Sequence, residues 1–188
     1  MQYMGDAAWW DKRFEARGQQ PLPPDAALIR HLERLKPGEA LDIACGDGRN
    51  ALYLAEQGFR VTGADFSVSA LNRLHSFARK RGLAVETVPI DFSSEEAFCG
   101  LGIYDTIIVN HYRMSVSLLA RLPQHVASGG TVWINGFCCL PRSNTAITEQ
   151  ELIRREDYAG LESAFRRILQ EEYETELGNF LTLLYQKK

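Results

Sequence analysis

No apolar run in this 188-residue sequence approaches the roughly twenty residues that a membrane span requires. We therefore expect no membrane-spanning helix. A basic N-terminal region followed by an apolar stretch is also missing, because Asp6, Asp11 and the Trp9-Trp10 pair occupy the start of the chain. This layout disfavours a secretory signal and predicts a cytoplasmic protein.

Cysteine is scarce, and its spacing disfavours the usual structural roles. Cys45, Cys99, Cys138 and Cys139 form no CxxC pair and no Cys/His set with zinc spacing. We expect no metal site and free thiols, as in a reducing compartment. The adjacent Cys138 and Cys139 could bind a soft element. However, neighbouring side chains on a strand point to opposite faces, which favours ordinary core or loop thiols.

The chain also lacks an excess of basic residues. It has 21 Lys and Arg against 24 Asp and Glu, which gives a net charge of −3. This balance gives no general attraction for nucleic acid, so we expect a small-molecule partner and neither nucleic acid nor membrane. Apolar residues make up 45% and charged residues 24%, as in ordinary soluble domains. Without repeats or linkers, the length predicts a single domain over 1–188, as a monomer or a homodimer.

The most informative segment reads Ala-Leu-Asp-Ile-Ala-Cys-Gly-Asp-Gly-Arg-Asn, over residues 40–50. An apolar run leads to Gly46 and Gly48, and a helical pattern comes next. Glycine permits a sharp turn and a close approach of a ligand, while the first helical N–H groups remain free to face it. About twenty residues later Asp65 ends a second apolar run, where a carboxylate can bind ribose hydroxyls. The pattern predicts a ligand that contains ribose, with a strand-end turn as the alternative role for Asp65.

Asp42 indicates which ribose compound is favoured. A dinucleotide fingerprint places a third glycine three residues after the second, but Ala51 occupies that position. The carboxylate of Asp42 would repel a pyrophosphate and suits an ammonium group. An NAD-dependent oxidoreductase is therefore the less favoured alternative.

Hydrophobic periodicity predicts strands that alternate with helices. The expected strands are 40–44, 60–64, 84–89, 104–110, 130–137, 166–175 and 180–186, and the expected helices are 24–35, 49–57, 67–80 (capped by Ser67) and 115–127 (interrupted near Pro123). The last two strands read as a hairpin joined by a Leu-Gly-Asn turn. We therefore expect an α/β fold: a Rossmann-like, seven-stranded, mostly parallel sheet with an antiparallel C-terminal hairpin strand and helices on both faces.

The pattern Asp-x-Ala-Cys-Gly-Asp-Gly resembles the first motif of class I S-adenosylmethionine-dependent methyltransferases, with Ala44 in place of the usual first glycine. The longer run 42–55, in which Gly-Arg-Asn precedes Ala-Leu-Tyr-Leu-Ala, is similar to the tellurite-resistance (TehB-like) branch of that family. The family also carries a C-terminal hairpin, so the resemblance spans the whole chain. It implies methyl transfer from S-adenosyl-L-methionine to a small-molecule acceptor of unknown identity. A non-catalytic nucleotide-sensing or partner-binding module is the alternative, because no indispensable catalytic side chain defines this chemistry.

The resemblance also implies a set of cofactor-binding residues: Trp10, Arg13, Asp42, Ala44, Gly46, Gly48, Asn50, Asp65, Phe66, Asp91, Phe92 and Asn110. In the family, an acid and a ring at the positions of Asp91 and Phe92 hold the adenine. Asp91 could instead cap a helix, and Asn50, with Arg49, could be an exposed residue of a first helical turn.

The aromatic N-terminal segment 1–20 matches a part that the family often uses as a lid over the cofactor. In this interpretation a flat ring such as Trp10 excludes water, and Arg13 pairs with the methionine carboxylate. The alternative is that the rings only anchor a terminal helix to the core.

Candidate catalytic residues come after the fourth expected strand, at His111, Tyr112 and Arg113. Because the methyl group of the cofactor is already activated, the protein mainly aligns the acceptor. His111 could act as a base and Arg113 could bind an anionic acceptor, although a loop histidine can equally be structural. The segment Asn-His-Tyr-Arg differs from the Asn/Asp-Pro-Pro-Tyr signature of methyltransferases that act on amino groups of nucleic acids or of glutamine, which weakens that subclass.

Overall fold

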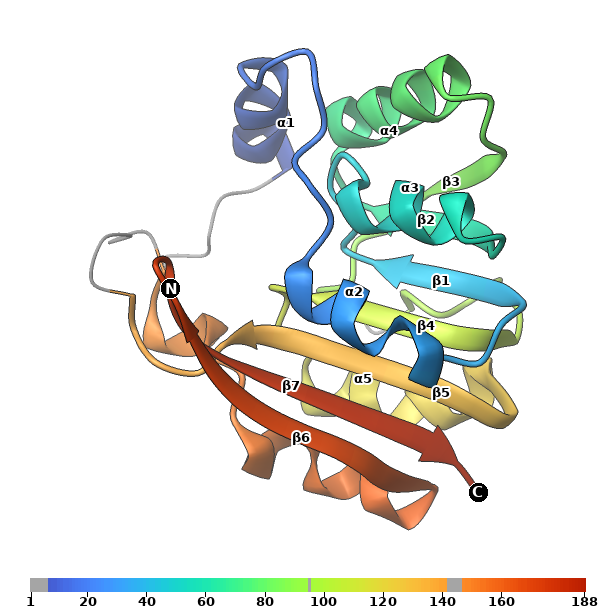
Figure 1. Ribbon diagram of the computed structural model, residues 1–188, viewed down its shortest axis with the longest axis vertical. Helices are drawn as coiled ribbons and strands as arrows, with labels where there is room; N and C mark the ends of the chain where they lie inside the picture. Colours follow the sequence, from blue (N-terminus) through green and yellow to red (C-terminus); the bar gives the residue numbers. More distant parts are fainter. Residues whose placement is uncertain (1–6, 95, 142–146) are drawn as a thin grey trace.

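A computed structural model describes residues 7–94, 96–141 and 147–188, which contain a seven-stranded sheet of order β3-β2-β1-β4-β5-β7-β6 (Figure 1). The strands are β1 Glu39–Ile43, β2 Arg60–Asp65, β3 Val85–Pro89, β4 Tyr104–Asn110, β5 Val126–Phe137, β6 Phe165–Thr175 and β7 Gly178–Lys187. Strand β7 runs antiparallel to both β5 and β6, and the remaining neighbours are parallel. This arrangement confirms the predicted mostly parallel sheet with one antiparallel hairpin strand.

The helices occur in the predicted order, but some are shorter than expected and are followed by 3-10 turns. They are α1 Ala7–Glu15, α2 Ala26–His31, α3 Arg49–Glu56, α4 Val68–Lys80 and α5 Val116–Arg121, with 3-10 turns η1 Leu32–Arg34, η2 Leu122–His125, η3 Glu149–Glu151 and η4 Arg155–Ser163. Ser67 caps α4 as expected, accepting from the N–H of Ala70 at 3.1 Å. The predicted helix 115–127 was too long, because Pro123 cannot continue the α-helical ladder and Val126 already belongs to β5.

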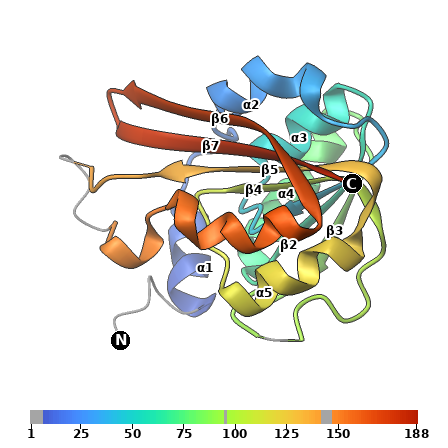
Figure 2. The ribbon, with the colours of Figure 1, turned by 90° about the horizontal axis from the view of Figure 1, so that it is seen from below.

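Helices and helical turns cover both faces of the sheet (Figure 2). On one face α2, α3 and α4 pack their apolar side chains against Ala40, Val61 and Trp133. On the other face α5 and η4 pack against Leu41 and Ile107. Ala40 and Leu41 belong to different cores because successive strand residues point to opposite sides. The two cores thus hold the sheet from both sides.

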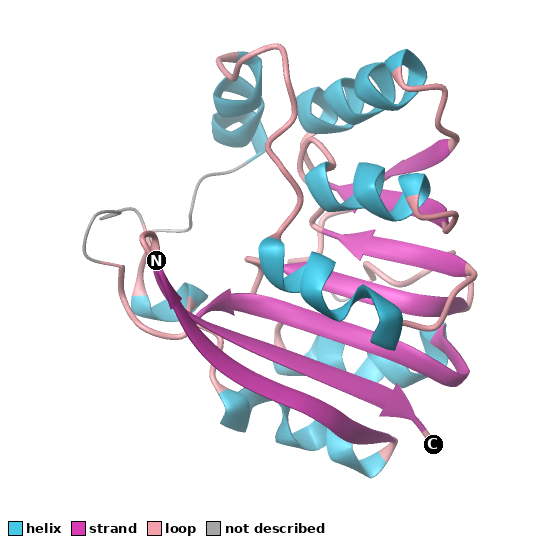
Figure 3. Ribbon diagram, in the orientation of Figure 1, coloured by secondary structure: helices cyan, strands magenta, loops and turns pink. Residues whose placement is uncertain are grey.

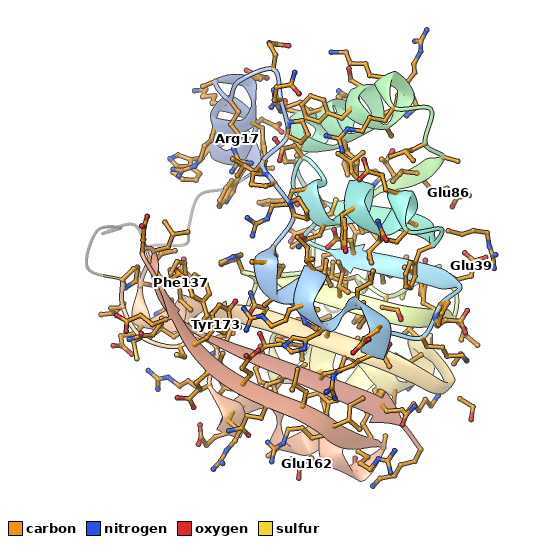
Figure 4. All side chains as sticks on the ribbon, viewed as in Figure 1. Arg17, Glu39, Glu86, Phe137, Glu162 and Tyr173 are labelled. Carbon is orange, nitrogen blue, oxygen red and sulfur yellow. The ribbon has the colours of Figure 1, made fainter. Side chains whose placement is uncertain are left out.

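The carboxyl ends of the parallel strands gather at one end of the sheet (Figure 3). Ile43 pairs with Ala64 on one side and with Val109 on the other, so β2, β1 and β4 end at about the same level. Figure 4 shows Phe137 and Tyr173 at this end and Glu39 at the opposite end. The strand order reverses direction between β1 and β4, and ligands of open α/β sheets bind beyond the carboxyl ends at such a point.

Candidate functional site

The turn between β1 and α3 has three residues in the left-handed backbone region. They are Ala44, Gly46 and Gly48, with φ values of +53°, +56° and +83°. A Cβ on Gly48 would lie 2.2 Å from Cδ1 of Leu74, so this glycine is required both by its φ and by the packing of α4. Ala44 adopts the same region with a side chain, which costs roughly 1–2 kcal/mol. This strain explains why a glycine is the usual residue in the motif.

Asp65, at the end of β2, is joined to the glycine turn. Its Oδ2 accepts from the N–H of Gly46 at 2.8 Å, and its Oδ1 accepts from the N–H of Ser67 at 2.9 Å. Burial raises the pKa of Asp65, and these N–H groups oppose the shift. A carboxylate offers about four acceptor positions, so both oxygens can accept further hydrogen bonds from a ligand.

Asp42 lies inside β1, only 2% exposed, and its Oδ2 has no hydrogen-bond partner among the described residues. Burial raises its pKa to about 8; Arg49 opposes this shift and Asp65 adds to it. A buried carboxylate oxygen without a donor is costly in free energy. The side chain therefore fits a ligand that brings a cationic N–H donor to the glycine turn.

Asp91 and Phe92 come directly after β3, as predicted. Oδ1 of Asp91 accepts from the N–H of Ser93 at 2.8 Å, which closes a local turn. No described residue of the segment 91–101 is helical, so the helix-cap alternative for Asp91 is wrong. Phe92 is 4% exposed and its ring lies 6.4 Å from that of Tyr112, which links the end of β3 to the end of β4. Phe66, after β2, is partly exposed.

Helix α1 is fastened to α4 and to the glycine turn. Asp11 accepts from Oγ of Ser67 at 2.6 Å, and the ring of Phe14 lies 3.0 Å from the position of a Cβ on Gly46. Just after α1 lies Arg17 (labelled in Figure 4), which pairs with the buried Asp47 at 3.0 Å. Asp47 also pairs with Arg73 of α4, at 3.2 Å.

The two α1 residues expected at the cofactor lie side by side. The guanidinium of Arg13 lies 5.6 Å from the ring centre of Trp10 and 5.1 Å from that of Trp9. Such spacing is typical of cation–π contacts, which hold a cation over a ring. Helix α1 is thus anchored to α4 and to the glycine turn, as the alternative interpretation expects, while its role as a lid stays a prediction. Residues 1–6 of the expected lid segment lie outside the described residues.

A buried polar network ties Asn110 to the C-terminal hairpin. Nδ2 of Asn135 donates to Oδ1 of Asn110 at 3.0 Å, while Oδ1 of Asn135 accepts from the hydroxyls of Tyr173 (3.0 Å) and Thr182 (2.7 Å). Asn135 is not among the residues predicted from the sequence. Its side chain is fully buried, and it lies opposite Asn110 in the β4–β5 register. The only sign of it in the sequence is a polar amide residue within an otherwise apolar strand.

His111 has an unusual backbone and a charged neighbour. Its φ is +56°, and its N–H donates to the carbonyl of Asn135 at 2.7 Å. Its Nε2 lies 3.6 Å from Oδ2 of Asp25, and its ring centre lies 5.4 Å from that of Phe137 and 5.5 Å from that of Phe180. Asp25, which was not predicted from the sequence either, caps α2 by accepting from the N–H of Ala27 at 2.9 Å.

The remaining predicted residues after β4 and at the start of α3 have contacts close to their own elements. Arg113 pairs with Asp157 at 2.7 Å, and Tyr112 is partly buried. Asn50 is 3% exposed and accepts from the N–H of Asp25 at 2.9 Å, so the alternative of an exposed first-turn residue is wrong for Asn50. Its neighbour Arg49 pairs with the Asp25 carboxylate at 3.2 Å.

The thiols and the acidic clusters do not build a metal site within the described residues. All four cysteines are free, and Cys139 is exposed. Burial raises the pKa of Cys138 to about 11, and Cys139 adds to this shift.

A surface hollow near Phe165 and Lys187 lies at the end of the sheet opposite the glycine turn. Across the described ranges, no helix has the length and apolarity to cross a membrane.

Several solved structures with this fold are methyltransferases. TehB from Haemophilus influenzae superimposes with a TM-score of 0.69 over 97% of this chain and 67% of that chain, at 20% identity. Magnesium protoporphyrin IX methyltransferase from Synechocystis, solved with bound S-adenosylmethionine, gives 0.64 over 97% of this chain and 79% of that chain, at 16% identity. These likenesses establish a Rossmann-like methyltransferase fold.

Within that fold class, the profile of the family described as tellurite resistance protein TehB matches residues 9–129, so the chain belongs to the TehB family. A probable S-adenosyl-L-methionine-dependent methyltransferase TehB from Haemophilus influenzae is 28% identical over 65% of this chain and 42% of its own length. A 2-heptyl-1-hydroxyquinolin-4(1H)-one methyltransferase from Mycobacteroides abscessus is 34% identical over 45% of this chain and 37% of its own. The chain thus spans less than half the length of these curated relatives.

Proposed function

We propose that this protein is an S-adenosylmethionine-dependent methyltransferase with a small-molecule acceptor, acting as one domain over residues 1–188. The observation that carries the proposal is the buried Asp42 carboxylate, whose Oδ2 has no partner among the described residues. It lies below a glycine turn and close enough to Asp65 for the two charges to interact. Membership of the TehB family and the methyltransferase fold support the same proposal.

The residues at the strand ends match the separate parts of the cofactor. Asp42 would pair with its ammonium group, and the N–H groups around Gly46 and Gly48 would face its methionine portion. Asp65 would accept the ribose hydroxyls, and Asp91, next to the Phe92 ring, would hold the adenine. When bound, the cofactor supplies a methyl group that the positive sulfur has already activated.

Helix α1 would act as the lid of this site. Phe14 already lies against the glycine turn, and Asp11 bonds to the residue directly after Phe66. A helix in this place excludes water from the reacting groups, which strengthens the electrostatic contacts beneath it. In this proposal Trp10 and Arg13 close over the methionine end of the cofactor.

A small-molecule acceptor agrees with the net charge of the chain and with the named substrate of one relative. The net charge of −3 gives no general attraction for nucleic acid, and one relative is a methyltransferase of a hydroxyquinolone. Another relative, 29% identical over 53% of this chain, is a ribosomal RNA small subunit methyltransferase, so RNA belongs in the test. The four free thiols suit a reducing cytoplasm.

Calorimetric titration tests the cofactor, with S-adenosylmethionine, S-adenosylhomocysteine and NAD as ligands. We expect the two sulfur compounds to bind and NAD not to bind. Substituting Asp42→Asn should weaken binding of both, because both carry the ammonium group. Preferential binding of NAD would contradict the proposed cofactor and with it the proposed methyl transfer.

Transfer of a labelled methyl group separates an enzyme from a sensor. The panel contains phenols, thiols, amines, tellurite, selenite and an RNA hairpin. Transfer to any small acceptor supports the proposal, and transfer only to RNA contradicts the acceptor class. Binding of the cofactor without transfer to any member favours a nucleotide-sensing module.

A further inference from the structure

We propose that His111 and Asp25 form a proton-accepting pair, and that the acceptor of this protein presents a weakly acidic hydroxyl group, as in a phenol or an enol. The inference rests on the proposed function, since it concerns the acceptor side of the same site. It assigns a role to Asp25, which belongs to none of the motifs recognised in the sequence.

The geometry leaves one imidazole nitrogen for the acceptor. Nε2 of His111 lies 3.6 Å from Oδ2 of Asp25, within reach of a charge-assisted contact that can tighten when a substrate binds. No described residue forms a hydrogen bond with Nδ1. A carboxylate beside Nε2 favours the tautomer with the proton on that nitrogen, which keeps Nδ1 free to accept one.

Asp25 keeps its negative charge in this position. Burial alone would raise its pKa, but the contacts with His111, Arg49 and the N–H of Ala27 together hold it below the ordinary value. The carboxylate therefore stays ionised through the neutral range. An ionised Asp25 can stabilise the imidazolium that forms when Nδ1 takes up a proton.

Asn135 positions both members of the pair. Its backbone carbonyl accepts from the backbone N–H of His111 at 2.7 Å, and its side-chain Nδ2 lies 3.4 Å from Oδ2 of Asp25. The side chain is fully buried and is fixed by the hydroxyls of Tyr173 and Thr182. The left-handed backbone of His111, at φ +56°, is held against its intrinsic cost by this network. Such strain is concentrated at functional sites, where surrounding contacts hold a reactive side chain in place.

The surroundings of the pair favour a neutral acceptor. Arg113 is compensated by Asp157 at 2.7 Å, and Arg49 by Asp25 itself at 3.2 Å. Neither guanidinium is left to bind an acceptor that is already an anion. The ring of Phe137 is partly exposed beside the imidazole, which offers an aromatic surface to a ring-bearing acceptor.

The proposed step balances without an oxidant or a metal. The hydroxyl oxygen forms its new bond to the methyl carbon, and its O–H bond breaks. The proton moves to Nδ1 of His111, giving an imidazolium next to the Asp25 carboxylate. The electron pair of the broken carbon–sulfur bond stays on sulfur, so the positive charge leaves the cofactor and appears on the imidazole.

A series of para-substituted phenols of increasing acidity tests the pair, with the 188-residue chain and saturating cofactor. The variant His111→Asn should lower kcat/KM for phenol itself by about 100-fold, the usual contribution of a general base. For 4-nitrophenol, which is largely ionised at mildly alkaline pH, the loss should be roughly threefold or less, because no proton has to be removed. Asp25→Asn should show the same trend with smaller losses, since an amide preserves the cap of α2.

Nitrogen-15 shifts of the His111 ring give a readout that does not depend on activity. We expect the proton on Nε2 in the native protein and a loss of this preference in Asp25→Asn. His75→Asn serves as the matched control because His75 is exposed on α4, and it should change neither the ring shifts nor the phenol series.

The outcomes separate this inference from the proposed function. An equal loss for all phenols, or an unchanged tautomer in Asp25→Asn, would overturn the pair. Transfer to thiols or oxyanions but to no phenol would overturn the acceptor class and leave the methyltransferase proposal intact. Failure of the native protein to bind S-adenosylmethionine would remove both.

Discussion

The backbone N–H of Gly46 donates to the carboxylate of Asp65 across 2.8 Å, which locks the glycine turn to the end of β2. The carboxylate that shapes the turn is therefore also the one that we propose to bind the ribose. If it does, a change at Asp65 should alter both the geometry of the turn and the affinity for the ligand.

Replacing Asp65 with Ala should weaken S-adenosylmethionine binding by on the order of 2 kcal/mol, roughly 30-fold in Kd, through the loss of charge-assisted hydrogen bonds. Calorimetric titration measures the change. Asp105→Ala is the matched control, since Asp105 lies at the start of β4 and pairs with Lys36 at 2.9 Å. The control should leave the affinity unchanged, and an unchanged affinity in folded Asp65→Ala would remove Asp65 from the site.

The raised pKa of Asp42 predicts a pH-dependent stability. In the ligand-free folded protein, burial keeps a proton on Asp42 up to about pH 8, whereas the unfolded chain releases it near the ordinary aspartate pKa of 3.8. The ammonium group of the proposed cofactor would favour the ionised form when it binds. The stabilising contribution of Asp42 is thus fully present below the unfolded pKa and is lost as pH rises toward about 8. Asp42→Asn should gain stability relative to the native protein as pH rises, by an amount on the order of a few kcal/mol.

Urea denaturation at several pH values measures this difference. Asp105→Asn is a control of opposite sign, because a hydrogen bond from Lys36 lowers the pKa of Asp105. The native contribution of Asp105 is present above its unfolded pKa and is lost as pH falls, so this variant should be weakened at neutral pH. A pH-independent difference for Asp42→Asn would contradict the protonation that burial imposes on Asp42.

Ala44→Gly should stabilise the protein by about 1 kcal/mol, because glycine adopts the left-handed region without a Cβ penalty. The φ of Ala44 is +53°. Chemical denaturation measures the change in unfolding free energy. Ala55→Gly, within α3, is the control of opposite sign and should lose about 1 kcal/mol. Equal destabilisation of both variants would show that Ala44 is not strained.

Arg17→Ala should loosen α1 while the sheet remains intact. The variant removes one of two guanidinium groups that pair with the buried Asp47, which lowers the free energy of local opening by roughly 1–3 kcal/mol. Hydrogen exchange over residues 7–15 should speed up, and saturating S-adenosylmethionine should slow it again if α1 covers the cofactor. Arg79→Ala, exposed on α4, should leave these exchange rates at the native level.

Local sequence signals predicted the elements that frame the site. The bounds of β4 and the Ser67 cap of α4 were right because alternation and capping act over a few residues. The 3-10 turns were missed, and β5 begins at Val126 rather than at 130, because such ends depend on how Pro123 and its neighbours pack. The helix-cap alternative for Asp91 was similarly excluded by the conformation of the next residues, whose described part forms a turn and not a helix.

The sequence by itself determined the strand–glycine–helix turn, the acid at the end of β2 and the mostly parallel sheet, since all three result from short-range backbone chemistry and periodicity. Only the tertiary structure decided that Asp25 lies beside His111 and that Asn135 links β4 to the C-terminal hairpin. These contacts join residues far apart in the chain. Their geometry depends on strand order and register, which no local pattern encodes.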